Sequence, residues 1–183
     1  MTHTHTHTKT ETVGAFRQTK IPFDINPRQF IKDSFGHDLP IHGGWGYTKD
    51  DCVIIDKDDN IVSKSISFNG IRIEKAFVEK RLYTELIVLA PMDYQFAGIE
   101  WKLLKQELSL SDGKAFDKLI YEVRGFRHKD WDMLKAEYEG TGGYNTPDFD
   151  KQAHERKRKE LMVRFVDEFW FEITSFFGKD LEE

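Results

Sequence analysis

The chain has 183 residues, of which 39% are hydrophobic and 14% aromatic, and its formal net charge is −5. This composition excludes intrinsic disorder for most of the chain, and the length suits one domain whose core needs no disulfide or metal. The negative charge argues against a protein that wraps nucleic acid, and no run approaches the ~18 apolar residues of a membrane span.

Cysteine content and the N-terminus give a first expectation about location. Cys52 is the single cysteine, so an intrachain disulfide is excluded. It begins an apolar run, where a free thiol more often acts as a small buried hydrophobe than as a nucleophile. The N-terminus lacks the apolar stretch of a secretory signal. We therefore expect a cytoplasmic protein with no membrane contact.

Residues 1–15 read as a His/Thr-rich tail, and residues 16–183 as a single globular domain. His3, His5 and His7 alternate with threonine in a polar, low-complexity run. Three imidazoles on such a segment could capture Ni²⁺ or Zn²⁺, but a tag-like or disordered tail is the stronger interpretation. The sequence predicts no cofactor and no metal site.

The first helix is marked at both ends. Asn26 is a good N-cap, Pro27 suits the first helical position, and Gly36 can end the helix in a left-handed conformation. The spacing therefore predicts a helix over 27–35. Residues 36–47, rich in glycine and aromatics, are expected to form a loop.

The next segments predict a hairpin, a helix and a strand. Residues 52–56 and 61–68 have strand character and are separated by four residues typical of turns. Residues 72–82 fit a short helix. Residues 84–90 are apolar and β-branched enough for a buried strand that ends before a proline.

Residues 94–110 fit both a strand with a bulge at Gly98 and a helical stripe. We favour the strand, because the turn residues of 111–113 follow it and the apolar residues of the next run again alternate. A helix is predicted over 128–139, with Trp131, Leu134 and Tyr138 facing inward. The strand over 94–110, the alternating run after the turn 111–113 and the strand over 84–90 together predict an antiparallel meander.

The last segment predicts a helix of about 30 residues. Thr146 and Pro147 provide a cap and a first turn, and Gly178 can end the helix. Its second half has apolar and mostly aromatic residues at steps of three and four, which places them on one helical face. The expected fold is α+β: an antiparallel sheet of about five strands packed against this long aromatic-rich C-terminal helix and shorter helices.

The strongest candidate site is the loop 37–51. Its glycines allow close approach of a ligand, Trp45 and Tyr47 offer flat surfaces, and His42 can act as an acid or base that Asp51 orients. We therefore take His42, Trp45 and Tyr47 as ligand-binding candidates, and His42 and Asp51 as catalytic candidates. The alternative, which we favour, is a surface loop that packs its tryptophan back onto the sheet.

Two weaker candidates follow. The glycine-rich residues 140–145 could bind an anion at a helix start, but acidic residues follow them and a connector is the better interpretation. Arg156, Lys157 and Lys159 could contact an acidic protein partner or nucleic acid. Because glutamates interrupt this run and no aromatic residue interleaves, a solvated helix face is favoured.

The sequence alone does not select a function. Common motifs of hydrolases, nucleotide-binding loops and zinc sites are absent from it. Our leading hypothesis, reached by exclusion, is a non-enzymatic binding protein of the inhibitor or immunity type that acts on a protein partner or assembles as a homodimer. The alternative is a small enzyme or ligand-binding domain that uses the loop 37–51. Nucleic acid is the least favoured partner.

Overall fold

A computed structural model describes residues 20–62, 67–140, 142–143 and 146–178. Their contacts divide into two units that interleave along the chain. We call the first the sheet unit; it holds Lys20–Glu85, Leu103–Tyr121 and residues 167–178. The second, the helix-pair unit, holds Leu86–Lys102 and the described part of Glu122–Val166. The predicted single domain stays a prediction, and the predicted tail lies outside the described residues.

The fold is α+β, as predicted, but the sheet is mixed. The strands are β1 (Ile41–Gly43), β2 (Val53–Ile55), β3 (Phe96–Ser111), β4 (Lys114–Arg127) and β5 (Val163–Glu172). The α-helices are α2 (Pro27–Phe35), α3 (Gly70–Tyr83), α4 (His128–Gly140) and α5 (Lys151–Leu161). The strand order is β1-β2-β5-β4-β3. Strand β2 pairs antiparallel with β1 but parallel with β5, so the prediction of a wholly antiparallel sheet was wrong.

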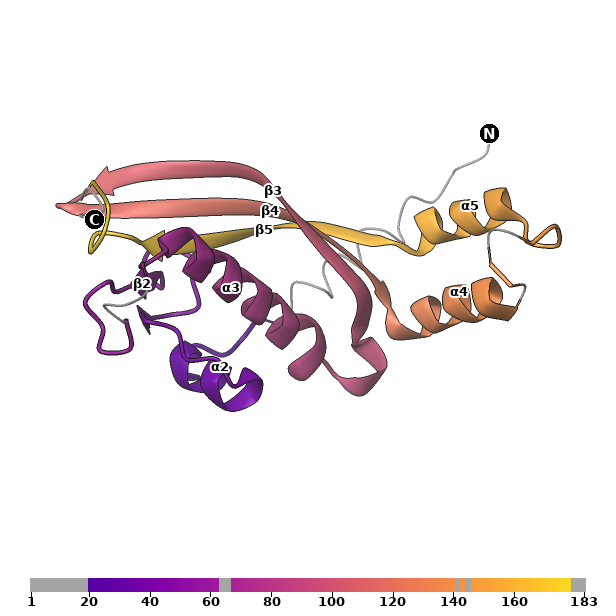
Figure 1. The fold of residues 1–183 in the computed structure, drawn as a ribbon, viewed down its shortest axis with the longest axis horizontal. Coiled ribbons are helices and arrows are strands. Elements are labelled where there is room, and N and C mark those ends of the chain that lie inside the picture. Colours follow the sequence, from indigo (N-terminus) through magenta and orange to yellow (C-terminus); the bar gives the residue numbers. More distant parts are fainter. Residues whose placement is uncertain (1–19, 63–66, 141, 144–145, 179–183) are drawn as a thin grey trace, which may run out of the picture. The chain divides into compact units, whose positions relative to one another are not determined.

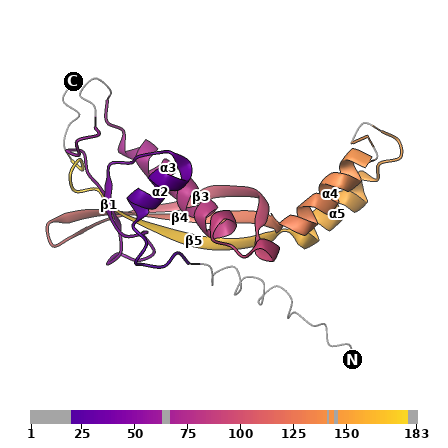
Figure 2. The same cartoon turned by 90° about the horizontal axis from the view of Figure 1, so that it is seen from below.

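Within the sheet unit, α2 and α3 lie on the same face of the strands (Figures 1 and 2). In the helix-pair unit, α4 and α5 lie side by side in both views. None of the described helices combines the length and the apolar composition that a membrane crossing would need.

The long C-terminal helix was the main error of the sequence analysis. Helix α5 begins only at Lys151, where the Asp150 side chain accepts a hydrogen bond from the Ala153 amide, and it ends at Leu161. The aromatic run that follows is strand β5, in which buried and exposed residues alternate. The apolar residues of this run satisfy a period of two as well as steps of three and four. Aromatic and β-branched side chains favour the strand.

Two other predicted elements were also wrong. The apolar run 84–90, predicted as a strand, continues α3 as a short π-helix, Thr84–Val88. Among the described residues, the neighbours of strand β2 are β1, which forms inside the expected loop 36–47, and β5, so the predicted hairpin of β2 with 61–68 was wrong. Residues 63–66 lie outside the described part of the chain.

The elements with clear local signals were confirmed. Asn26 caps α2 through its side chain and Gly36 ends the helix with φ of 67°. Helices α3 and α4 and the long strand β3 also form where they were predicted. Asp112 and Gly113, with φ of 52° and 75°, make the two-residue turn between β3 and β4. Two successive positive φ values are typical of a hairpin turn that matches strand twist.

The core of the sheet unit is aromatic and encloses a charge. The Phe77 ring lies between those of Trp45 and Phe171, at centroid distances of 5.9 and 5.7 Å. Beside this cluster the Arg81 guanidinium is fully buried, with its carbon 4.0 Å from the Tyr47 ring centroid and 3.9 Å from that of Phe169. A buried cation between two aromatic faces gains from their negative quadrupole.

Arg81 also joins distant segments through polar contacts. Its Nε donates to Glu85 Oε1 at 2.9 Å, and its Nη1 donates to the carbonyls of Trp45 and Gly46 at 3.2 Å. Its Nη2 lies 3.0 Å from Asp167 Oδ1, which makes an ion pair although no N–H points well enough for a hydrogen bond. One guanidinium therefore connects α3, the loop before β2 and strand β5.

Replacing Arg81 should cost much of the stability of the sheet unit. Arg81→Met keeps the apolar stem but leaves the buried Glu85 carboxylate and Asp167 without their cation, and such a loss costs about 3–5 kcal/mol. Urea unfolding should show this decrease in the free energy of unfolding. Arg72→Met, on the exposed part of the same helix, is the control and should change it by less than about 0.5 kcal/mol. Equal effects of the two variants would contradict the account.

Candidate functional site

The predicted loop packs its aromatic residues inward. Trp45 is 1% exposed, and its Nε1 donates to the Ile25 carbonyl at 2.9 Å. The Tyr47 hydroxyl donates to Glu85 Oε1 at 2.5 Å and accepts from the Ile21 amide. Burial raises the pKa of Tyr47 above its ordinary value. The Trp45 ring is therefore part of the core and presents no face to a ligand.

Asp51, the predicted partner of His42, contacts the backbone of its own loop instead. The Asp51 Oδ1 and carbonyl oxygens both accept from the Gly46 amide, at 3.0 and 2.8 Å, so Asp51 shapes the turn. Gly46 has φ of 80°, and a Cβ there would lie 2.9 Å from the Trp170 carbonyl oxygen. A glycine is required at this close approach.

His42 is exposed, and it lies beside two acids that are less exposed than it is. Its Nε2 is 3.2 Å from Asp56 Oδ2 and 3.3 Å from Asp59 Oδ2, and these three groups offer ligand atoms within 4.8 Å of one another. Arg28 already binds both oxygens of Asp59, at 2.7 and 3.1 Å, and this contact lowers the pKa of Asp59. A divalent cation would have to displace that guanidinium. Because Arg28 already occupies Asp59, the structure does not favour a metal there.

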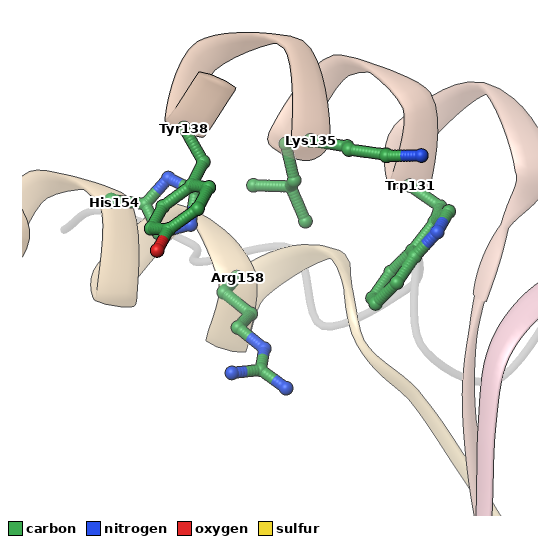
Figure 3. A pocket seen from close by; sticks show the side chains of 6 residues that line it. Trp131, Lys135, Tyr138, His154 and Arg158 are labelled. Carbon is green, nitrogen blue, oxygen red and sulfur yellow. The ribbon is translucent and has the colours of Figure 1, made fainter. Parts of the chain in front are cut away.

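A pocket lies within the helix-pair unit, between α4 and α5. Its volume is about 230 Å³. Helix α4 and helix α5 line it with aromatic, apolar and cationic side chains: Trp131, Leu134, Lys135, Tyr138, His154 and Arg158. Figure 3 shows Trp131, Lys135 and Tyr138 along α4, with His154 and Arg158 on α5. We call this hollow the α4–α5 pocket.

Packing behind the α4–α5 pocket holds its walls. The Trp131 ring packs on Phe126 at 5.4 Å, and a Cβ on Gly98 would lie 2.5 Å from the same ring. At the other end the Phe149 ring meets Tyr138 edge-on at 5.7 Å and His154 at 5.0 Å. Both ends of the pocket therefore rest on other aromatic side chains, which favours a pocket that exists before a ligand arrives.

The basic run of α5 divides between solvent, an ion pair and the pocket. Arg156 and Lys159 are exposed, and Lys157 Nζ donates to Glu137 Oε2 on α4 at 3.2 Å. Arg158, which was not among the predicted partner-binding residues, lines the pocket. The clue in the sequence was the spacing: 131, 134, 135 and 138 share one face of α4, as 154 and 158 share one face of α5.

The sequence analysis also missed a buried carboxyl pair. Glu74 of α3 and Asp117 of β4 are 5% and 3% exposed, and their carboxyl groups are neighbours. Burial and the neighbouring Asp117 raise the pKa of Glu74 to about 9. The raised pKa favours a protonated Glu74 at neutral pH, and the Gln106 amide donates to Asp117 Oδ2 at 2.6 Å. This pair is enclosed in the sheet unit and serves packing there.

Comparison with known proteins adds nothing to this geometry, since no family, no curated protein and no solved structure matches the chain.

The carboxyl pair predicts a fall in stability at alkaline pH. A pKa of about 9 in the folded chain, against about 4.5 when unfolded, means that the folded state binds the Glu74 proton more tightly. The stabilising contribution is complete below pH 4.5 and is lost as the pH rises towards 9. Urea unfolding at pH 6 and pH 9 should show a decrease of a few kcal/mol between the two.

Glu74→Gln tests the cause of this pH dependence. An amide keeps a donor towards Asp117 but does not titrate, so the variant should lose most of the difference between pH 6 and pH 9. Glu79→Gln, on the same helix but only half-buried, is the control and should keep the wild-type difference. If Glu74→Gln retained the full difference, another group would be responsible.

Proposed function

We propose that this chain is a non-enzymatic binding protein whose α4–α5 pocket takes a small organic anion with a flat apolar body. The observation that carries the proposal is the combination of two aromatic walls, an apolar floor and two cationic side chains in one hollow. Apolar walls with a few polar groups that fix orientation are the usual composition of ligand sites.

The side chains of the pocket form two groups, each of which suits a different part of a ligand. The rings of Trp131 and Tyr138, together with Leu134, suit a planar apolar body. Arg158 and Lys135 suit a carboxylate or similar anion, and the planar guanidinium can bind two oxygens at once. A volume of about 230 Å³ lies below that of a drug-sized site, so the ligand is compact, of about one or two fused rings.

The hypothesis of a protein partner has separate support. Strand β3 carries leucines that are about half exposed or more, Leu104, Leu108 and Leu110, in the sheet unit. Contiguous exposed apolar residues often indicate an interaction surface. The loop 37–51 is the weaker candidate for binding or catalysis, because Trp45 is buried, Tyr47 is half-buried and, of the three ligand-binding candidates, only His42 is exposed.

Indole-3-acetate is a suitable probe of the pocket, and indole-3-acetamide is its uncharged counterpart. Isothermal titration should show binding of the acetate with a dissociation constant near 1 mM or below, and at least about fivefold weaker binding of the acetamide. Arg158→Met should weaken binding of the acetate by about fivefold, because the anion loses its fork of donors.

Lys159→Met is the matched control, since Lys159 is the next residue on the same helix and is exposed. It removes the same formal charge from α5 but should leave the affinity within about twofold of the wild type. If both variants weakened binding equally, attraction by general charge would explain the result. If acetate and acetamide bound equally well, the cations would have no role and the proposal would fail.

A further inference from the structure

Strand β3 ends the sheet on one side. In the strand order that the structure gives for its described residues, β4 is the sole neighbour of β3. Its second half, from Leu103 to Ser111, belongs to the sheet unit and stays exposed along most of its length. An edge strand of this length presents unpaired N–H and C=O groups that invite another strand.

The two faces of this edge carry different side chains. The Gln106 amide reaches the buried Asp117, so the even-numbered residues of the segment lie on the face that α3 covers. On the opposite face Glu107 contacts Lys105 at 2.7 Å and Lys118 of β4 at 3.7 Å. Leucines therefore line one face of the edge, and alternating charges line the other.

The turn between β3 and β4 determines which backbone groups face outward. A two-residue turn makes the residues on its two sides, Ser111 and Lys114, a hydrogen-bonded pair. Hydrogen-bonded and non-bonded pairs then alternate along the ladder. The backbone groups of the even-numbered residues, Leu104, Gln106, Leu108 and Leu110, point away from β4 and towards the open edge.

We infer that this edge pairs antiparallel with the same edge of a second copy of the chain, about a twofold axis at Gln106. In that register Leu104 lies opposite Leu108 of the second copy on one face, and Lys105 lies opposite Glu107 of the second copy on the other. Both contacts occur twice because of the symmetry. The outward backbone groups of Leu104, Gln106 and Leu108 meet their counterparts, so the pairing extends the sheet.

The charges favour this register over the two registers that are shifted by two residues. A slip by two residues in one direction places Lys105 opposite Lys105 of the second copy. The opposite slip places Glu107 opposite Glu107. Like charges directly across a strand pair are destabilising, whereas opposite charges and apolar pairs are stabilising. The sequence of the edge is therefore complementary to itself in one register. For this reason we infer that the partner strand comes from a second copy of the chain.

Charge reversal tests the inference on the full chain by sedimentation velocity over a concentration series. The wild type should be a concentration-dependent mixture of monomer and dimer. Lys105→Glu and Glu107→Lys each place two pairs of like charges across the interface, and each should raise the dimer dissociation constant by about tenfold or more. The double variant restores both pairs with exchanged signs and should return to within about threefold of the wild type.

A mixture of the two single variants gives the sharpest result. One chain then carries two glutamates and the other two lysines at these positions, so the heterodimer should form while each homodimer is weak. Circular dichroism with heating would verify that all variants stay folded. A wild type that remains monomeric at millimolar concentration would overturn the inference. Single variants that dimerise as the wild type does, or a double variant no better than they are, would do so too.

Discussion

The buried guanidinium of Arg81 is the interaction on which the sheet unit depends. A cation without water must find compensating groups, and here they come from three separate segments: Glu85 at the end of α3, the carbonyls of Trp45 and Gly46, and Asp167 of β5. If any of these segments moved away, the buried charge would lose a compensating group and the folded state would be destabilised. The charge therefore specifies the arrangement of the segments as well as their proximity. The rings of Tyr47 and Phe169 exclude water from the same site.

This constraint also explains the loop that looked most like a functional site. Glycines, tryptophan and tyrosine in 43–47 suggest a ligand loop, but the same residue types suit a loop that must bring its carbonyls to a buried cation. Gly46 permits the close approach to β5, Trp45 fills the core, and Tyr47 donates to Glu85. Glycine and aromatic residues in a loop are thus ambiguous until the packing is known.

Local signals in the sequence predicted local structure well. The caps of α2 and the turn residues between β3 and β4 act over a few residues, so their meaning does not depend on the rest of the chain. The errors arose where tertiary packing decides. Strand β5 fits two periodicities, and its partners, β2 and β4, lie far away in the sequence. The segment 84–90 has strand propensity, yet Thr84 and Glu85 continue α3, and Glu85 meets Arg81 there.

The α4–α5 pocket was predictable in its parts but not as a whole. Trp131 and Tyr138 could be assigned to one face of a helix, whereas the partner face of α5 could not be chosen while that helix was thought to run on to 177. In the structure α5 ends at Leu161 and Arg158 lines the pocket, which makes Arg158 the binding candidate in place of its exposed neighbours. The pocket and the self-complementary edge of β3 belong to different units, so the two proposals stand independently.

The most direct test of the proposed binding site is an NMR titration that follows the indole N–H signals of the four tryptophans. With indole-3-acetate added, the account predicts that the Trp131 signal shifts progressively, whereas that of Trp45, whose N–H is bonded to the Ile25 carbonyl in the core, stays in place. A shift of Trp45 without a shift of Trp131 would contradict the account, and it would return attention to the loop around His42.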